Sequence, residues 1–171
     1  MKIKHLLNLT AILVFFAIIS CEVEEKLHPR PTTPEGFIEY NKFKITIEQG
    51  VSGTLLFQEG SCGPVLDTLQ CETYPVTRTI RIYELTTRED TKPDEGAFFS
   101  EVHTKLVTKV ESDKDGFFQV KLKPGKYSMF IEEDGRLYAN LTGRNGEILA
   151  STVDSGWVTL TNPEITWKAV Y

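Results

Sequence analysis

The chain has 171 residues, of which 40% are hydrophobic and 25% are charged, so it is long enough for one ordinary globular domain. Its 24 acidic residues outnumber its 19 basic ones, and the formal net charge at pH 7 is −5. This acidic balance argues against nucleic acid or an anionic phosphate surface as the partner.

The first twenty residues have the organisation of a secretory signal. Lys2 and Lys4 precede a mostly apolar run over residues 6–19, which is too short for a comfortable membrane span. The run ends in Ser20-Cys21, and a small residue directly before a cysteine resembles the bacterial lipobox. The resemblance implies cleavage before Cys21 and attachment of acyl chains, which would anchor the protein stably. An uncleaved anchor or an ordinary secretory signal with a chance cysteine is the alternative.

The residues after Cys21 predict a tether. Glu22-Val23-Glu24-Glu25 resembles the export signal of Bacteroidetes-type surface lipoproteins, although a plain solvated acidic segment would have the same composition. Residues 27–36 contain three prolines, which favour an extended, semi-rigid spacer. We therefore expect an outer-membrane lipoprotein displayed on the cell surface, with periplasmic-facing attachment as the alternative. The expected organisation is a signal peptide (1–20), a lipidated tether (21–36) and a folded body (37–171).

The body alternates apolar and polar residues in short runs, which is typical of β-strands. Gly53, inside one such run, predicts a bulge or a close backbone approach. Residues 86–101 read as a long polar loop, and no segment has a period of 3.6 residues. We therefore expect an all-β fold with strands at residues 43–48, 51–57, 77–85, 103–111, 118–123, 126–131, 136–142, 147–153, 156–161 and 164–171.

The most distinctive run lies at residues 112–127. Asp115-Gly116 predicts a tight turn with a positive φ at Gly116, and Phe118, Val120 and Leu122 alternate on one face of the strand that follows. Pro124-Gly125 then ends that strand.

These residues resemble a known family. The pattern Ser-Asp-x-Asp-Gly-x-Phe-x-Val-x-Leu-x-Pro-Gly-x-Tyr at residues 112–127 is similar to the hallmark of carboxypeptidase regulatory-like domains, the transthyretin-like β-sandwiches. Residues 50–57 resemble the opening strand of that family. The resemblance implies a single antiparallel Greek-key β-sandwich of about seven to nine strands, used as a non-catalytic accessory module.

Two cysteines remain once Cys21 is lipidated. Cys62 and Cys71 lie in a loop rich in glycine and proline at residues 59–75, and an exported chain most simply joins them in a disulfide. Free thiols or a metal pair are the alternatives. No histidine lies nearby in the sequence, and the spacing is too long for a zinc knuckle.

The sequence offers little for catalysis, and we expect neither an enzyme nor a cofactor. Only one of the three histidines, His103, lies in the expected body, and no serine-hydrolase, metalloprotease or phosphate-loop motif is present. The hydrolase branch of the transthyretin-like proteins ends in a Tyr-Arg-Gly-Ser-type sequence, whereas this chain ends in Lys168-Ala169-Val170-Tyr171. Asp113 and Asp115 match the start of a calcium loop, but Phe117 occupies the position of the next oxygen ligand. We therefore expect a structural turn there.

Aromatic side chains are the best candidates for a partner surface. The candidates are Phe98, Phe99, Tyr138 and Trp157, although Phe98 and Phe99 could instead pack as a lid over the end of the sandwich. Trp167 is in step with Ile165 and Ala169, so we expect it in the core.

These observations predict a lipid-anchored binding or scaffolding module of the cell envelope, whose partner is an envelope protein or a glycan. A minor fimbrial or adhesin subunit, or an accessory subunit of an envelope hydrolase, is the alternative.

Overall fold

The computed structural model describes residues 29–63 and 70–171, so the expected signal peptide and Cys21 lie outside the described residues. A compact unit spans Thr33–Tyr171. As predicted, it consists mostly of strands that form sheets and no barrel, and the fold is an all-β sandwich. No helix among the described residues is long and apolar enough to cross a membrane.

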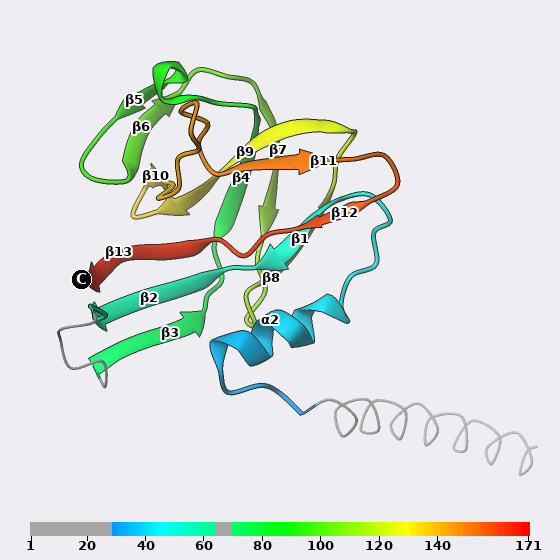
Figure 1. Ribbon diagram of the computed structural model, residues 1–171, viewed down its shortest axis with the longest axis vertical. Helices are drawn as coiled ribbons and strands as arrows, with labels where there is room; N and C mark the ends of the chain where they lie inside the picture. The colour runs from blue at the N-terminus through cyan, green and yellow to red at the C-terminus, as the bar shows by residue number, and fades with distance from the viewer. Residues whose placement is uncertain (1–28, 64–69) are drawn as a thin grey trace, which may run out of the picture. The chain divides into compact units, whose positions relative to one another are not determined.

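The described residues form three sheets (Figure 1). The largest has the order β5 (Thr91–Pro93), β6 (Phe98–Val102), β10 (Arg136–Tyr138), β9 (Gly125–Glu133), β4 (Thr79–Glu84) and β7 (Leu106–Glu111), with β11 (Ala150–Val153) also paired to β9. The second has the order β12 (Val158–Leu160), β1 (Gly50–Thr54) and β8 (Phe117–Lys121). The third has the order β13 (Glu164–Val170), β2 (Leu56–Ser61) and β3 (Cys71–Pro75), which lie side by side in Figure 1.

The number of strands and two of their pairings differ from expectation. The described residues contain thirteen strands: the run at residues 51–57 is divided between β1 and β2, β3 forms in the expected loop at residues 59–75, and β5 and most of β6 form in the expected loop at residues 86–101. The other pairings are antiparallel, but β1 pairs with β12 and β2 pairs with β13 in parallel. Two late strands therefore complete the two small sheets.

The alternating apolar residues of β4 and β8 are buried. Ile80 and Ile82 on β4 have no exposed surface, and Phe118 and Leu122 at β8 are buried. Val120 is partly buried and packs against the same core. The alternation of residues 118–122 thus marks the inner face of β8, as the sequence predicts.

Strand β9 is buried on both faces. Met129 and Ile131 on one face are each 1% exposed, and Ser128 and Phe130 on the opposite face have no exposed surface. On this second face Phe130 packs against Tyr83 and Phe99, and the Ser128 hydroxyl accepts a hydrogen bond from the Thr86 N–H. Leu141, by contrast, lies within the strand expected at residues 136–142 but is 59% exposed, because β10 already ends at Tyr138.

Two glycines have the roles that the sequence predicts. Gly116 has a φ of 73°, which favours glycine, and a Cβ there would lie 2.5 Å from the carbonyl oxygen of Leu55. At Gly53 a Cβ would lie 1.6 Å from the carbonyl oxygen of Thr161. The predicted close backbone approach at Gly53 is therefore present.

The segment before β1 is helical, which corrects the expected spacer and first strand. Helix α2 (Pro34–Lys42) begins after Thr33, whose hydroxyl accepts a hydrogen bond from the Gly36 N–H at 3.1 Å. A threonine cap, a proline at the first helical position and an acid in the first turn all favour a helix start. Residues 43–48 form no strand, and the side-chain carbonyl of Gln119 accepts hydrogen bonds from the N–H groups of Thr46 and Ile47 instead.

Candidate partner-binding site

Three of the four aromatic residues expected at a partner surface are buried. Phe98 and Phe99 are each 5% exposed, and Tyr138 is 1% exposed, so their assignment to an exposed surface is wrong. Strand β6 lies between β5 and β10, and its rings pack edge to face inside the sheet: the ring centroids of Phe98 and Tyr138 are 5.2 Å apart, and those of Phe99 and Phe130 are 5.4 Å apart. The packing interpretation of Phe98 and Phe99 is the better one.

Trp157 is exposed, as expected. It lies in the turn between β11 and β12, and 72% of its surface is accessible. Its carbonyl oxygen accepts a hydrogen bond from the Gly50 N–H at 3.1 Å, so its backbone is well placed. In the described part of the chain its ring stacks on no other ring and carries no cation, which leaves it an isolated contact point.

A larger aromatic surface, not identified from the sequence, crosses the third sheet. Phe57 on β2 is 3% exposed, and it lies between Tyr74 on β3 and Trp167 on β13, which are 36% and 37% exposed. The ring centroid of Phe57 is 5.8 Å from that of Tyr74 and 6.3 Å from that of Trp167. The ring centroids of Trp167 and Phe98 are 5.9 Å apart. We call these four residues the aromatic belt.

Trp167 reaches this surface because β13 is irregular. The sequence places Trp167 in step with Ile165, which has no exposed surface. The register of β13 against β2 shifts between Ile165 and Lys168, so that simple alternation no longer applies. The expected core position of Trp167 is therefore wrong, and its ring lies at the margin of the core.

Two cations lie on the rings of the aromatic belt. The Lys168 Nζ is 4.9 Å from the ring centroid of Trp167 and 5.6 Å from that of Phe57, and the Arg136 guanidinium is 3.8 Å from that of Phe98. All three distances suit cation–π attraction. Arg136 also contacts Asp94 at 3.4 Å, whereas within residues 29–63 and 70–171 no carboxylate oxygen lies within 4 Å of the Lys168 Nζ.

Tyr74 also contributes a positioned polar group. Its hydroxyl donates a hydrogen bond to the Glu59 carboxylate at 2.7 Å, and this bond, with burial as a smaller cause, raises the pKa of Tyr74. The phenol is thus held protonated and its ring orientation is restrained. The belt therefore combines apolar ring surface with a hydroxyl, a carboxylate and an ammonium group.

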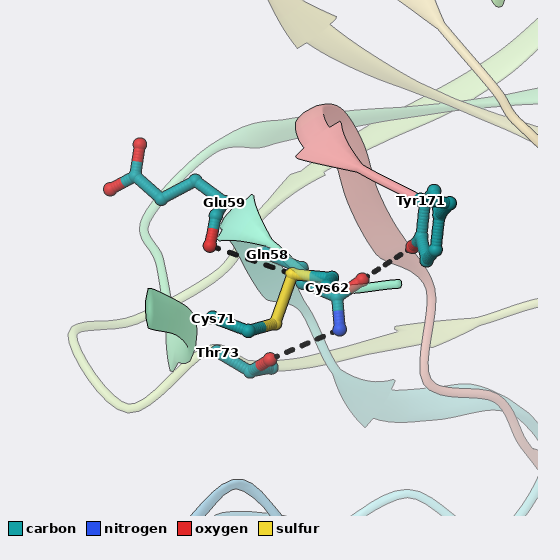
Figure 2. The surroundings of a disulfide bond; sticks show 6 residues. All are labelled: Gln58, Glu59, Cys62, Cys71, Thr73 and Tyr171. Carbon is teal, nitrogen blue, oxygen red and sulfur yellow. Dashed lines mark hydrogen bonds between the residues drawn. A yellow bond between two sulfur atoms is a disulfide. The ribbon is translucent and has the colours of Figure 1, made fainter. Parts of the chain in front are cut away.

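A disulfide joins the outer ends of β2 and β3, as the sequence predicts. The Sγ atoms of Cys62 and Cys71 are bonded, and Figure 2 shows Gln58, Thr73 and Tyr171 beside them. The Tyr171 hydroxyl donates to the Gln58 side-chain oxygen at 2.5 Å, and the Gln58 amide nitrogen donates to Thr73 at 3.4 Å. These bonds connect all three strands of the sheet that carries Tyr74 and Trp167.

Asp113 and Asp115 serve the hallmark turn. One oxygen of Asp113 accepts hydrogen bonds from the N–H groups of Asp115 and Phe117, and the Lys44 Nζ lies 3.0 Å from Asp113 and 2.9 Å from Asp115. Burial lowers the pKa of Lys44, but its hydrogen bonds to Asp115 and Asp113 outweigh this effect and raise it overall. Among the described residues no group of three or more His, Cys, Asp or Glu could hold a metal ion.

A cavity of about 590 Å³ lies at the β9–β10 end of the largest sheet. It is lined by Arg78, Arg81, Ser100 and the residues Glu132, Glu133, Asp134, Gly135, Arg136 and Leu137. Its arginines are paired with carboxylates: Arg78 with Glu133 at 2.8 Å, Arg81 with Glu132, and Arg136 with Asp94. His103 lies elsewhere, exposed, with its Nε2 3.6 Å from Glu101.

No protein-family model matches this chain, and none of the curated proteins or solved structures gives a significant match. The chemistry of its own surface is therefore the basis for a functional proposal.

Proposed function

We propose that this chain is a non-catalytic, lipid-anchored binding or scaffolding module of the cell envelope, built on a carboxypeptidase regulatory-like β-sandwich. The lipobox-like Ser20-Cys21 supports the anchor, and the hallmark run at residues 112–127 supports the family. One observation carries the binding role: Tyr74 and Trp167 expose part of their rings on either side of Phe57, with the Lys168 ammonium group beside them.

The aromatic belt has the properties of a contact surface. Tryptophan and tyrosine provide large, rigid contact area, and each needs a polar partner for its N–H or O–H. Tyr74 is held by Glu59, and the sheet beneath is joined by a disulfide, so little order has to be gained on binding. The partner is an envelope protein or a glycan.

The charges in the cavity at the β9–β10 end of the largest sheet support a binding role over a catalytic one. A catalytic acid, base or nucleophile must be available to the substrate. The arginines that line this cavity are instead paired with carboxylates, and the Glu133 side chain is only 4% exposed.

The binding role can be tested in cells with a photo-cross-linking amino acid. The full-length protein would carry it at Tyr74 or Trp167, with Leu141, which is 59% exposed and distant from these rings in sequence, as the matched control. We expect one discrete adduct from the belt positions and little from the control. Equal adduct yields from all three positions, or none from any of them, would argue against the aromatic belt as a partner surface.

The anchor needs a separate experiment. Cys21→Ala should leave an uncleaved precursor that incorporates no labelled palmitate, because the acceptor thiol is absent. A Cys21→Ala variant that still takes up palmitate would overturn the lipoprotein part of the proposal without touching the binding part.

A further inference from the structure

The proposed partner surface leaves Trp157 unused. Its side chain is 72% exposed in the turn between β11 and β12. The backbone of this turn is held at two points. The Gly50 N–H donates to the Trp157 carbonyl oxygen at 3.1 Å, and the Gly156 N–H donates to the Gln49 side-chain oxygen at 2.9 Å. A large apolar ring is therefore presented to solvent on a well-held turn.

Three exposed lysines lie around the same turn. The Gln49 side-chain nitrogen donates to the Leu122 carbonyl oxygen at 2.8 Å, which joins the segment that carries Lys121 and Lys123 to the turn. Lys126 lies on β9 where this strand pairs with β11, the strand that leads into the turn. We call residues 154–157 together with these three lysines the tryptophan tip.

The ammonium groups of the tryptophan tip are available to a ligand. Within residues 29–63 and 70–171 none of the three has a carboxylate oxygen within 4 Å. Two acidic residues share the region, since Glu48 lines a hollow with Lys121 and Lys123, and Asp154 begins the turn. The tip thus has a small excess of positive charge on a chain whose net charge is −5.

An exposed tryptophan beside unpaired lysines suits the surface of a lipid bilayer. Tryptophan side chains gather at the level of the lipid headgroups, where the apolar ring is partly buried and its N–H still reaches a polar partner. Lysines extend their ammonium groups toward the headgroup phosphates while their aliphatic stems cover apolar surface. A protein partner would need a much larger contact area than one isolated ring offers.

The expected anchor supplies the membrane. The chain between Cys21 and Thr33, where the folded unit begins, spans at most about 40 Å when fully extended. A folded unit of this size has a radius of gyration of about 14 Å, so any of its faces can reach the bilayer. So short a tether keeps the effective concentration of the tip at the membrane in roughly the millimolar range, and a weak contact is then sufficient.

We propose that the tryptophan tip rests on the membrane that holds Cys21, with the Trp157 ring among the headgroups and the lysines beside their phosphates. The proposal rests on the anchor in the proposed function and adds the orientation of the folded unit. The β11–β12 turn and the C-terminal end of β13 lie on opposite sides of this unit (Figure 1). With the tip on the membrane, the aromatic belt is therefore held away from the bilayer and open to the partner.

Fluorescence quenching tests the contact, because the chain has two tryptophans. The full-length lipidated protein would be reconstituted into vesicles of phosphatidylethanolamine and phosphatidylglycerol, with or without bromine atoms on the acyl chains near the headgroups. In Trp167→Phe, which reports on Trp157, bromine should reduce the emission about twofold. In Trp157→Phe, which reports on Trp167, it should cause little change. Unquenched Trp157, or equal quenching of both tryptophans, would overturn the proposal.

A charge reversal in the Trp167→Phe background tests the lysines. Lys123→Glu, just after β8, should weaken the quenching of Trp157, because a carboxylate is repelled by anionic headgroups. Lys114→Glu, just before β8, is the matched control and should leave the quenching unchanged. The same quenching in both variants would contradict a contact made through the tip.

Incorporation of labelled palmitate, measured on the same samples, separates this proposal from the anchor on which it rests. Protein that carries the label but leaves Trp157 unquenched is anchored, and that result overturns the tip contact alone. Protein without the label would overturn the anchor and the tip contact together.

Discussion

The largest sheet and the β13–β2–β3 sheet differ in how far their aromatic side chains are exposed. In the largest sheet, Ile80, Phe130 and Ser128 have no exposed surface, and β9 is covered on both faces. The β13–β2–β3 sheet has one fully buried ring, Phe57, between two partly exposed ones, and a disulfide at its outer end. Buried side chains stabilise both sheets, since Leu56 and Ile165 are buried as well, but the β13–β2–β3 sheet adds a disulfide and side-chain hydrogen bonds that hold it while two of its rings stay accessible. Mutations should therefore separate folding from binding.

The largest expected effect lies in the core that the largest sheet shares with β8. Phe118→Ala should lower the free energy of unfolding by about 3–5 kcal/mol, because it leaves a cavity at a side chain that is 1% exposed. Chemical denaturation measures this loss. Lys121→Ala, on the exposed face of the same strand, is the control and should cost less than about 0.5 kcal/mol. Similar losses in the two variants would remove the basis for assigning stability to this core.

Removal of the disulfide should have the second-largest effect on stability. The double variant Cys62→Ser/Cys71→Ser opens a loop closed across a sequence separation of 9, and the chain-entropy model gives a loss of about 2.7 kcal/mol. Denaturation of the oxidised and reduced wild-type protein should reproduce the same difference. A loss near zero would mean that hydrogen bonds alone hold the outer end of this sheet.

The two exposed tryptophans should differ by a smaller amount. Trp167→Ala should cost about 1–2 kcal/mol, since only part of its ring is buried, and Trp157→Ala should cost less than about 0.5 kcal/mol. In binding to the partner, Trp167→Ala should weaken affinity at least tenfold while Trp157→Ala leaves it nearly unchanged. The reverse order in binding would move the partner surface to the β11–β12 turn.

The smallest expected effect comes from Lys44, and it changes with pH only in the alkaline range. Lys44 has a raised pKa in the folded protein, so its contribution to stability is complete below the unfolded value of about 10.5 and is lost as the pH rises through the higher folded value. Lys44→Met should therefore be less stable than the wild type at neutral pH, and the difference between the two should shrink above pH 10.5. Denaturation midpoints across that range test this, and a difference independent of pH would exclude the ion pair as its cause.

The sequence predicts those structural features that depend on residues close to one another along the chain. Residues 118–122 alternate because one face of β8 is buried, and Gly116 follows Asp115 because the turn needs a positive φ. Helix α2 also had a local signal, the capping threonine followed by proline and glutamate, which the density of prolines around it obscured.

The candidate site depends on contacts between distant segments, so the sequence does not reveal it. Phe98 and Phe99 stand among polar residues that resemble a loop, and they are buried because β10, far along the chain, pairs with β6. Trp167 is exposed because β13 changes register against β2. The residues next to these rings in the sequence indicate neither the pairing of β6 with β10 nor the register shift of β13.

The parallel pairs have a consequence for the order of assembly. Thr54 donates its N–H to the Asn162 side chain across 108 positions, and β1 and β2 both pair with strands from the last part of the chain. During folding, contacts between residues so distant in sequence form slowly. The β2–β3 hairpin needs only nearby residues, so we expect it to form early and to offer its open side to β13. Protease digestion of nascent chains of increasing length would reveal protection only after β13 emerges. The β13–β2–β3 sheet is thus completed by a strand that is synthesised long after the hairpin on which it docks.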